Sequence, residues 1–375
     1  MKLALLKGEK TFICKVMVSR RTTLRDIAKV CDCSAMAVSL ALRNHTSVSK
    51  KRRAKIRAVA KQLNYSPDPT LSALAAYRQT HYPKPTATPI AWITTYPTRN
   101  YWIKPHHFVN QYFQGATQRA KEIGYHIEHF WLGEPGMTPQ RLSKILYSRG
   151  ISGILIAPQH RTFAHLNLDW DKFCAVTFGY SLTRPRLHMT TSNQYRSMGM
   201  VMRKLRSLGY RRIGLMLLSI HDKRVIHNLY AAYLMEQLRM PAKLKIPAFF
   251  VPESSHNIEA EKLKWFRAHR PEVIITSNGS GLDEILRSEG LRCPEDIGLV
   301  SLGTSDRRAN ETDQIFSGAD ENTEATGVAA MDLLVTLMHR NERGVPATPR
   351  TVLIDSKWVP GTTVRRINAN TTVEA

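Results

Sequence analysis

The side chains between Ser34 and Arg53 combine a small apolar surface with a run of four adjacent cations. The cations, Lys50 to Arg53, follow Ser49, which suits the N-cap of a helix. Cations in a first helical turn oppose the helix dipole, and a nearby phosphate offsets that cost. Upstream, a short helix after Ser34 presents Met36 and small neighbours outward, a face that fits base edges in the major groove. These residues predict DNA recognition, with a solvated basic face on an ordinary helical bundle as the alternative.

Three helices must position these side chains, and apolar residues at helical spacing indicate all three. Thr23, Ser34 and Ser49 suit the three N-caps, and the Cys31 to Cys33 segment suits a sharp turn between the first two helices. The predicted inward faces are Leu24, Ile27, Ala28 and Cys31, then Ala37, Val38, Ala41 and Leu42, then Ile56, Val59, Ala60 and Leu63. The predicted outward face of the second helix is Ala35, Met36, Ser39, Leu40 and Arg43. The arrangement is a helix-turn-helix followed by a third helix.

A fourth, short helix is predicted after this bundle. Asp68 suits an N-cap and Pro69 the first helical position, so about two turns can begin there. A helix that short is marginal alone in water, and we expect it to form only against DNA and its copy from a second subunit.

Residues 23–75 resemble, without a gap, the DNA-binding headpiece and hinge of the lactose and galactose repressor (LacI/GalR) family. The matching pieces are TLRDIA, the turn, AVSLALRN, the VS before the third helix, and LNY-x-P followed by the hinge. The resemblance implies that Thr23, Ser39, Asn44, Ser49 and Tyr65 touch phosphates, that Ala35, Met36 and Leu40 read bases, and that Leu74 wedges into the minor groove. Many relatives carry arginine at the position of Leu40, so direct readout here is expected to be apolar or shifted to Arg43. The full set of expected DNA contacts is Thr23, Leu24, Ser34, Ala35, Met36, Ser39, Leu40, Arg43, Asn44, Ser49, Arg53, Tyr65, Leu71, Leu74 and Ala75.

Charge supports the same partner. The chain has 375 residues and a formal net charge of +24. Between Met17 and Thr80, 13 Lys and Arg stand against 3 Asp and Glu, which marks this region as the electrostatic footprint on DNA. Strong, salt-sensitive non-specific DNA binding follows from such an excess.

The remaining composition bounds the compartment. No run of about 18 apolar residues could span a membrane, and MKLALLKGEK is broken by charge too early for a signal peptide. The five cysteines are scattered and odd in number, which favours a reducing cytoplasm. The family resemblance implies that this cytoplasm is bacterial and that the protein is associated with the nucleoid. Cys31 and Cys33 lack the second pair that a zinc site needs, so no metal is expected. Relatives begin just before the Thr-Leu pair, and we expect translation to start at Met17.

Beyond a proline-rich linker, strands and helices alternate, a pattern typical of a parallel sheet covered on both faces. The predicted strands are 90–96, 153–158, 174–180, 212–218, 273–278 and 297–303, and the predicted helices are 109–123, 197–208, 225–239 and 260–269. Two such α/β units in series make two lobes with a ligand cleft between the carboxyl ends of their strands. The LGYRRIG and EDIGLVSLG segments resemble the core of the same family, which implies a two-lobe, periplasmic-binding-protein-like fold with three crossings, near His188, Ser317 and Pro346.

The predicted organisation is a small all-α helix-turn-helix headpiece with a hinge helix, followed by the α/β two-lobe core. Its predicted parts are an N-terminal extension (1–20), the helix-turn-helix domain (21–66), the hinge helix and linker (67–89), the effector-binding and dimerisation domain (90–366) and a tail (367–375).

The ligand site is where the chain departs most from sugar-binding relatives. Their clamping arginine and aspartate align with Leu229 and Gly279, so an ordinary sugar is not the expected effector. The candidate effector residues are Tyr96, Phe108, Tyr180, Asn193, Arg224 and Asn278, with core or interface packing as the alternative for the three aromatic residues.

No catalytic motif is present. The sequence lacks G-x-G-x-x-G after a strand, G-x-x-x-x-G-K, G-x-S-x-G and H-E-x-x-H, so neither an enzyme nor a cofactor is expected. The leading hypothesis is a homodimeric transcription regulator, which we expect to be a repressor. It would bind a pseudo-palindromic operator and respond to a small-molecule effector in the cleft. The alternative is a DNA-binding dimer whose core has lost its effector. A ligand carrier or enzyme with an incidental basic start is a third, weaker possibility.

Overall fold

The computed structural model describes residues 22–42, 44, 47–63, 65, 88–104, 107–253, 257–277, 282–303 and 315–367. The chain divides into two compact units, Met1–Ala76 and Tyr77–Ala375, and each is described by itself. The predicted N-terminal extension and hinge helix lie outside the described residues, and with them Leu71, Leu74 and Ala75. Arg43 and Asn278 lie outside them as well.

The first unit contains the three predicted helices. They are α1 (Leu24–Cys31), α2 (Ala35–Leu42) and α3 (Lys50–Gln62). The hydroxyl oxygen of Ser34 accepts from the Ala37 amide at 3.1 Å, and that of Ser49 accepts from the Arg52 amide at 3.4 Å, as expected of N-caps. At α1 the Asp26 carboxylate also accepts a bond from the Thr23 amide, at 2.8 Å. The three predicted helix starts are confirmed.

A small apolar core joins these helices. Its fully buried members come from all three helices and from the turn before α3, and they are Ile27, Ala28, Cys31, Val38, Ala41, Val48, Ile56, Val59 and Ala60. Every one except Val48 belongs to a predicted inward face. Each helix is too short to be stable alone, so the bundle depends on this shared core.

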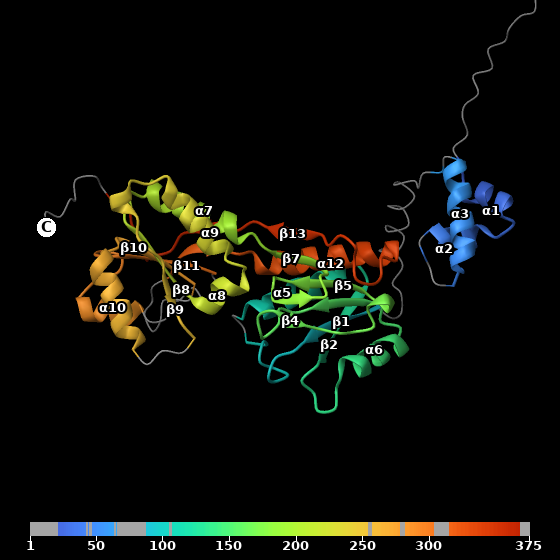
Figure 1. Ribbon diagram of the computed structural model, residues 1–375, viewed down its shortest axis with the longest axis horizontal. Coiled ribbons are helices and arrows are strands. Elements are labelled where there is room, and N and C mark those ends of the chain that lie inside the picture. The colour runs from blue at the N-terminus through green and yellow to red at the C-terminus, as the bar shows by residue number, and fades with distance from the viewer. Residues whose placement is uncertain are drawn as a thin grey trace, which may run out of the picture. The chain divides into compact units, whose positions relative to one another are not determined.

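The first lobe of the second unit is a six-stranded parallel sheet of order β13-β7-β5-β3-β1-β2 (Figure 1). Its strands are β1 (Thr88–Thr94), β2 (Tyr125–Trp131), β3 (Gly153–Ile156), β5 (Cys174–Phe178), β7 (His188–Ser192) and β13 (Thr351–Ile354). The other elements are α5 (Phe108–Glu122), α6 (Pro139–Ser148), α12 (Thr323–Arg340), the short pair β4 (Ala164–His165) and β6 (Leu182–Arg184), and the turn η1 (Trp170–Lys172).

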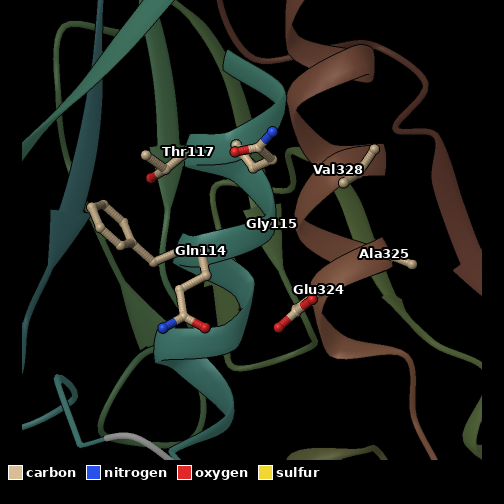
Figure 2. Close-up of a pocket in the computed structure, with 8 residues that line it drawn as sticks. Gln114, Gly115, Thr117, Glu324, Ala325 and Val328 are labelled. Atoms are coloured by element: carbon tan, nitrogen blue, oxygen red, sulfur yellow. The ribbon is translucent and has the colours of Figure 1, made fainter. Parts of the chain in front are cut away.

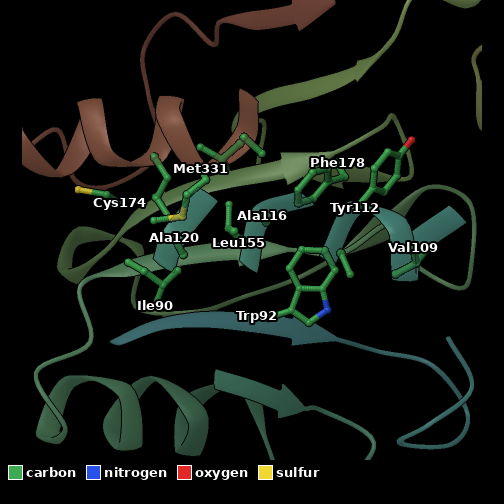
Figure 3. Packing of buried hydrophobic residues seen from close by; sticks show 14 of the residues in the cluster. Ile90, Trp92, Val109, Tyr112, Ala116, Ala120, Leu155, Cys174, Phe178 and Met331 are labelled. Atoms are coloured by element: carbon green, nitrogen blue, oxygen red, sulfur yellow. The ribbon is translucent and has the colours of Figure 1, made fainter. Parts of the chain in front are cut away.

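The two faces of this sheet have separate cores. Figure 3 shows Trp92, Leu155 and Phe178 of the sheet packed with Tyr112 of α5 and Met331 of α12. On the opposite face of the sheet, Leu142 and Leu146 of α6 pack with strand residues in a second apolar cluster. Coverage on both faces explains why β1, β3 and β5 are apolar runs rather than alternating strands.

The second lobe repeats the plan with the order β14-β12-β11-β10-β8-β9, in which β14 alone pairs antiparallel. The strands are β8 (Ile213–Leu218), β9 (Phe249–Val251), β10 (Val273–Thr276), β11 (Gly298–Leu302), β12 (Ser317–Asp320) and β14 (Lys357–Val359). The helices are α7 (Gln194–Ser207), α8 (Ser219–Arg224), α9 (Asn228–Leu238), α10 (Ile258–His269) and α11 (Leu282–Glu289), with the turn η2 (Ala242–Leu244). Helices α7 and α9 share one core with the sheet, and α10 and α11 share the other.

All three crossings between the lobes fall later than predicted. They occur where β7, β12 and β13 end, around Asn193, Asn322 and Asp355. The Asn193 amide nitrogen donates to the Asp355 carboxylate at 3.1 Å, and that of Asn322 donates to the Asp355 backbone oxygen at 2.6 Å. The predicted positions near His188, Ser317 and Pro346 were wrong, because His188 and Ser317 begin strands and Pro346 precedes one. A strand must finish its pairing in one sheet before the chain can leave for the other.

Candidate nucleic-acid interface and inter-lobe site

The outward face of α2 is dominated by one side chain. Met36 is 71% exposed, whereas Ala35, Ser39 and Leu40 are partly buried. Ala35 and Leu40 also pack against the headpiece core. The prediction of an entirely outward Leu40 was therefore too simple, because this side chain divides its surface between core and solvent. Met36 is left as the large apolar side chain that α2 can bring to a base edge.

The turn after α2 is held by arginines of α3. Arg53 donates to the Asn44 backbone oxygen at 2.9 Å, and Arg57 donates to the Asn44 side-chain oxygen. Asn44 has a left-handed backbone, with φ of 61°. The two arginines thereby orient a residue that is predicted to meet a phosphate. Sequence reasoning missed Arg57, although its spacing of four residues from Arg53 puts both on one helix face.

The other predicted DNA contacts of the headpiece have these positions. Thr23, Ser34 and Ser49 are exposed at helix starts, while Leu24 and Tyr65 are partly buried against the headpiece core. The Thr23 hydroxyl donates to Asp26 at 2.7 Å. All these contacts remain predictions, since DNA is needed to test them.

Helix α3 carries the strongest positive charge of the described headpiece. Its sequence, KKRRAKIRAVAKQ, contains seven cations and no acid, and most of these cations are exposed. Side chains of one sign on one helix add their fields, which suits the phosphates of a duplex.

The candidate effector residues that the structure describes gather where the two lobes meet, which we call the inter-lobe boundary. Arg224, at the end of α8 in the second lobe, donates to the backbone oxygens of His160 at 2.8 Å and Gln159 at 2.5 Å in the first. The Asn228 side chain of α9 lies beside Tyr180, which follows β5, and it lowers the pKa of Tyr180 against the larger, opposite effect of burial. Both contacts join residues of opposite lobes.

Asn193, a candidate effector residue, uses its side chain to bond other parts of the protein. Its amide nitrogen donates to Asp355, and its amide oxygen accepts from the Arg196 backbone at 3.3 Å as the N-cap of α7. Both polar atoms thus bind the protein at a crossing, which leaves little for a ligand.

Tyr96 lies in an aromatic cluster at the boundary. Its ring stacks on Tyr101 with centroids 5.3 Å apart and meets His107 and His160 edge-on, at 6.1 and 5.9 Å. Tyr96 is 3% exposed, and its hydroxyl has no hydrogen-bond partner among the described residues. Phe108 stacks on His107 at 4.9 Å. Sequence reasoning missed Tyr101, His107 and His160, although the density of rings between 96 and 108 was a signal.

A second polar group at the boundary is Glu321, beside the second crossing. Burial and, to a smaller extent, the charge of the neighbouring Asp320 together raise the pKa of its carboxyl to about 7. The Ser192 hydroxyl donates to the Glu321 backbone oxygen at 3.1 Å. Burial raises the pKa of the nearby Tyr112, and the charge of Glu321 raises it too.

Glu321→Gln is expected to stabilise the core near pH 8 and to leave it little changed near pH 4. Between about 4.5 and about 7 the folded wild type holds a proton at Glu321 that the unfolded chain has released. Its free energy of unfolding therefore falls as pH rises through that window. Urea unfolding at the two pH values should show a smaller pH dependence in the variant. An equal dependence would contradict the assignment, and Glu324→Gln, at an exposed position, is the control.

A hollow lies on the first lobe between α5 and α12 (Figure 2). It is lined by Phe113, Gln114, Gly115, Thr117, Gln118, Glu324, Ala325 and Val328. A Cβ added to Gly115 would lie 2.0 Å from the Glu324 backbone oxygen, and one added to Gly327 would lie 2.2 Å from the Tyr112 backbone oxygen. The two helices therefore meet backbone to backbone.

Neither a metal-binding cluster nor a membrane-spanning helix is found among the described residues. Across the described ranges, no group of three or more His, Cys, Asp or Glu side chains is arranged to hold a metal ion. Cys31 is buried at the end of α1, and burial raises the pKa of its thiol. No helix in the described part of the chain is long and apolar enough to cross a membrane.

Residues 23–68 match the bacterial regulatory proteins of the lacI family, and residues 202–364 match the periplasmic binding protein-like domain. The chain belongs to the LacI family. This LacI-family chain is a DNA-binding transcription regulator with an effector-binding core, and the family is one of regulators rather than enzymes. The predicted fold class is confirmed, with three headpiece helices followed by two α/β lobes.

Solved structures show the same fold. The transcriptional regulator CelR in its cellobiose complex is 17% identical, covers 92% of this LacI-family chain and 100% of its own, and has a TM-score of 0.52. The lac repressor dimer bound to operator and the anti-inducer ONPF is 15% identical with the same coverage and a TM-score of 0.51. The transcription regulator CcpA of Lactococcus lactis is 14% identical over 74% of this chain and 100% of its own, with a TM-score of 0.51. Comparison with curated protein sequences gave no match.

Proposed function

We propose that this protein is a homodimeric repressor that binds a pseudo-palindromic operator and is modulated by a small molecule at the inter-lobe boundary. The observation that carries the proposal is the exposed Met36 on α2, beside the seven cations of α3. One short helix reads too few base pairs for a specific site, which favours two headpieces on two half-sites. The lac repressor relative is itself a dimer bound to operator.

Effector control is supported by contacts that depend on how the lobes are placed. Arg224 of the second lobe donates to two backbone oxygens of the first, and Asn228 of the second lobe lies beside Tyr180 of the first. A ligand that binds one lobe arrangement better than another shifts the population between them. The CelR relative was solved in complex with a small molecule, cellobiose.

A DNA-binding dimer without an effector is the second candidate, and Leu229 favours it. This residue stands where sugar-binding relatives have their arginine, and here it is buried in the core of the second lobe. A metabolite that changes both thermal stability and operator affinity would decide for the repressor, and failure of a broad screen would decide for the second candidate.

The DNA end of the proposal is tested by selecting bound sequences from a random pool. An enriched pseudo-palindrome is the expected result, and a single isolated half-site would contradict the dimer.

Leu74→Ala is then expected to weaken binding to the selected operator about tenfold and to reduce its bending, because a minor-groove wedge is lost. Leu74 lies outside the described residues, so its role rests on the family resemblance. Circular-permutation gel shifts measure the bend. The matched control is Leu238→Ala, which truncates a leucine that is 67% exposed at the end of α9 in the second lobe. An unchanged bend in the Leu74 variant would remove the wedge from the proposal.

A further inference from the structure

Arg224 carries a positive charge that no carboxylate in the described part of the chain neutralises. Among the described residues, its guanidinium has two hydrogen-bond acceptors, the neutral backbone oxygens of Gln159 and His160. The nearest acid in sequence, Asp222, is buried and already accepts from the His227 ring at 2.7 Å and from the Tyr230 amide at 3.3 Å. A half-buried guanidinium that bonds only neutral acceptors would gain from binding an anion, because hydrogen bonds to anions are about twice as strong as bonds to neutral acceptors.

The loop that faces Arg224 is held rigidly. Gln159 is 2% exposed, and its backbone amide is held in place because it donates to the Ser181 hydroxyl at 2.8 Å. Its side chain bonds both Thr95, at 2.9 Å, and the Ala157 backbone oxygen, at 2.7 Å. The place of the guanidinium is therefore set by fixed groups of the first lobe.

Tyr96, His107 and His221 lie within electrostatic reach of Arg224, and none of them carries a carboxylate. The Tyr96 hydroxyl is buried without a hydrogen-bond partner in the described part of the chain. The charge of Arg224 lowers the pKa of Tyr96 against the larger effect of burial. Burial, Lys104 and Arg224 together lower the pKa of His107, and burial and Arg224 lower that of His221. The δ nitrogen of His107 accepts from the Val109 amide at 3.3 Å, so its ε nitrogen carries the proton.

We propose that the effector is a small organic anion, a carboxylate or a phosphate ester, whose charged group binds Arg224 and the Tyr96 hydroxyl and whose body lies against the aromatic cluster of Tyr96 and Tyr101. This inference rests on the proposed effector control and names the class of ligand. The buried Tyr96 hydroxyl supplies a donor that no described residue of the protein accepts. Tyr101, which is 40% exposed and stacks on Tyr96, supplies a flat apolar surface.

The same contact explains how such a ligand would be coupled to the lobes. An anion is a stronger acceptor than a backbone carbonyl, so it competes with Gln159 and His160 for the guanidinium. Arg224 is then released from the first lobe or shared with the ligand, and the balance between lobe arrangements changes. The position is five residues before Leu229, so the cation is supplied from a different helix, α8, than the arginine of sugar-binding relatives.

The test uses the full-length protein with benzoate, inorganic phosphate and benzamide, the last being the neutral counterpart of benzoate. Thermal shift and calorimetry are expected to detect benzoate or phosphate at up to about 10 mM and to detect benzamide far more weakly. Arg224→Gln should weaken the anion at least about tenfold, and Arg224→Lys should weaken it less. Arg186→Gln, an exposed arginine of the first lobe, removes the same charge and should leave binding unchanged.

The outcomes separate this inference from the proposed function. Equal binding of benzoate and benzamide, no anion binding in the wild type, or full binding by Arg224→Gln would overturn the anion site. If Arg224→Gln does not fold, Arg224→Lys and the benzoate–benzamide contrast in the wild type still decide. An anion that binds through Arg224 without changing operator affinity leaves the site standing and removes effector control. A neutral metabolite that changes operator affinity while anions do not bind leaves the proposed function standing and removes the anion.

Discussion

Met36→Glu is expected to weaken specific operator binding roughly 10- to 100-fold, while the headpiece stays folded. The side chain is 71% exposed, so the substitution removes no core contact. In the proposed complex it would place a carboxylate against base edges between two rows of phosphates, where both desolvation and repulsion oppose binding. Fluorescence anisotropy with the selected operator measures the loss.

The matched control for this variant is Val30→Glu. Val30 is 56% exposed on α1 of the same headpiece, so the change adds the same charge to the same unit at a different place. A loss confined to Met36→Glu indicates a base-reading position, and Met36→Leu should stay within a few-fold of the wild type. Equal losses in both glutamate variants would show that only overall charge matters, and the base-reading role would fall.

The headpiece was readable from sequence because its determinants are local. Each helix start depends on a serine or threonine and an amide two or three residues later, and each inward face on apolar residues three or four apart. The same rule explains the error at Leu40. Helical spacing divides residues into faces, but a side chain near the edge of a face contacts both core and solvent, as Leu40 does.

The core was readable only where burial is complete. All six predicted strands and all four predicted helices are present, because buried parallel strands are continuous apolar runs. Strand β2 was missed since it lies at the sheet edge, where YHIEHFW mixes polar and apolar residues. Helix α12 was missed since its start has no capping side chain and its first turns are small residues packed tightly on α5.

The inter-lobe site could not be derived from spacing, because its contacts join distant segments. Arg224 and His160 are 64 residues apart in the chain, and Asn193 and Asp355 are 162 apart. Sequence reasoning placed Tyr96 and Arg224 in one set on the ground that both follow strands, and the structure brings them within electrostatic reach. It could not show that Asn193 would be used by the crossing instead.

Val38→Asp is expected to unfold the headpiece, to abolish operator binding and to leave the unfolding temperature of the core unchanged. Val38 is 0% exposed at the centre of the headpiece cluster. An unpaired buried carboxylate costs several kcal/mol, which is comparable to the whole free energy of unfolding of so small a unit. Differential scanning calorimetry of the full chain, together with operator binding, provides the measurement.

Val30→Asp is the control, because it adds the same carboxylate at an exposed position of the same unit. The contrast depends on the separateness of the two compact units, Met1–Ala76 and Tyr77–Ala375. If they fold independently, benzoate or phosphate should still bind the Val38→Asp protein through Arg224, because every residue of the proposed anion site belongs to the second unit. A simultaneous loss of core stability would instead mean that the units stabilise each other, and the regulator would then have to be treated as one cooperative body in which damage to the DNA end reaches the ligand end directly.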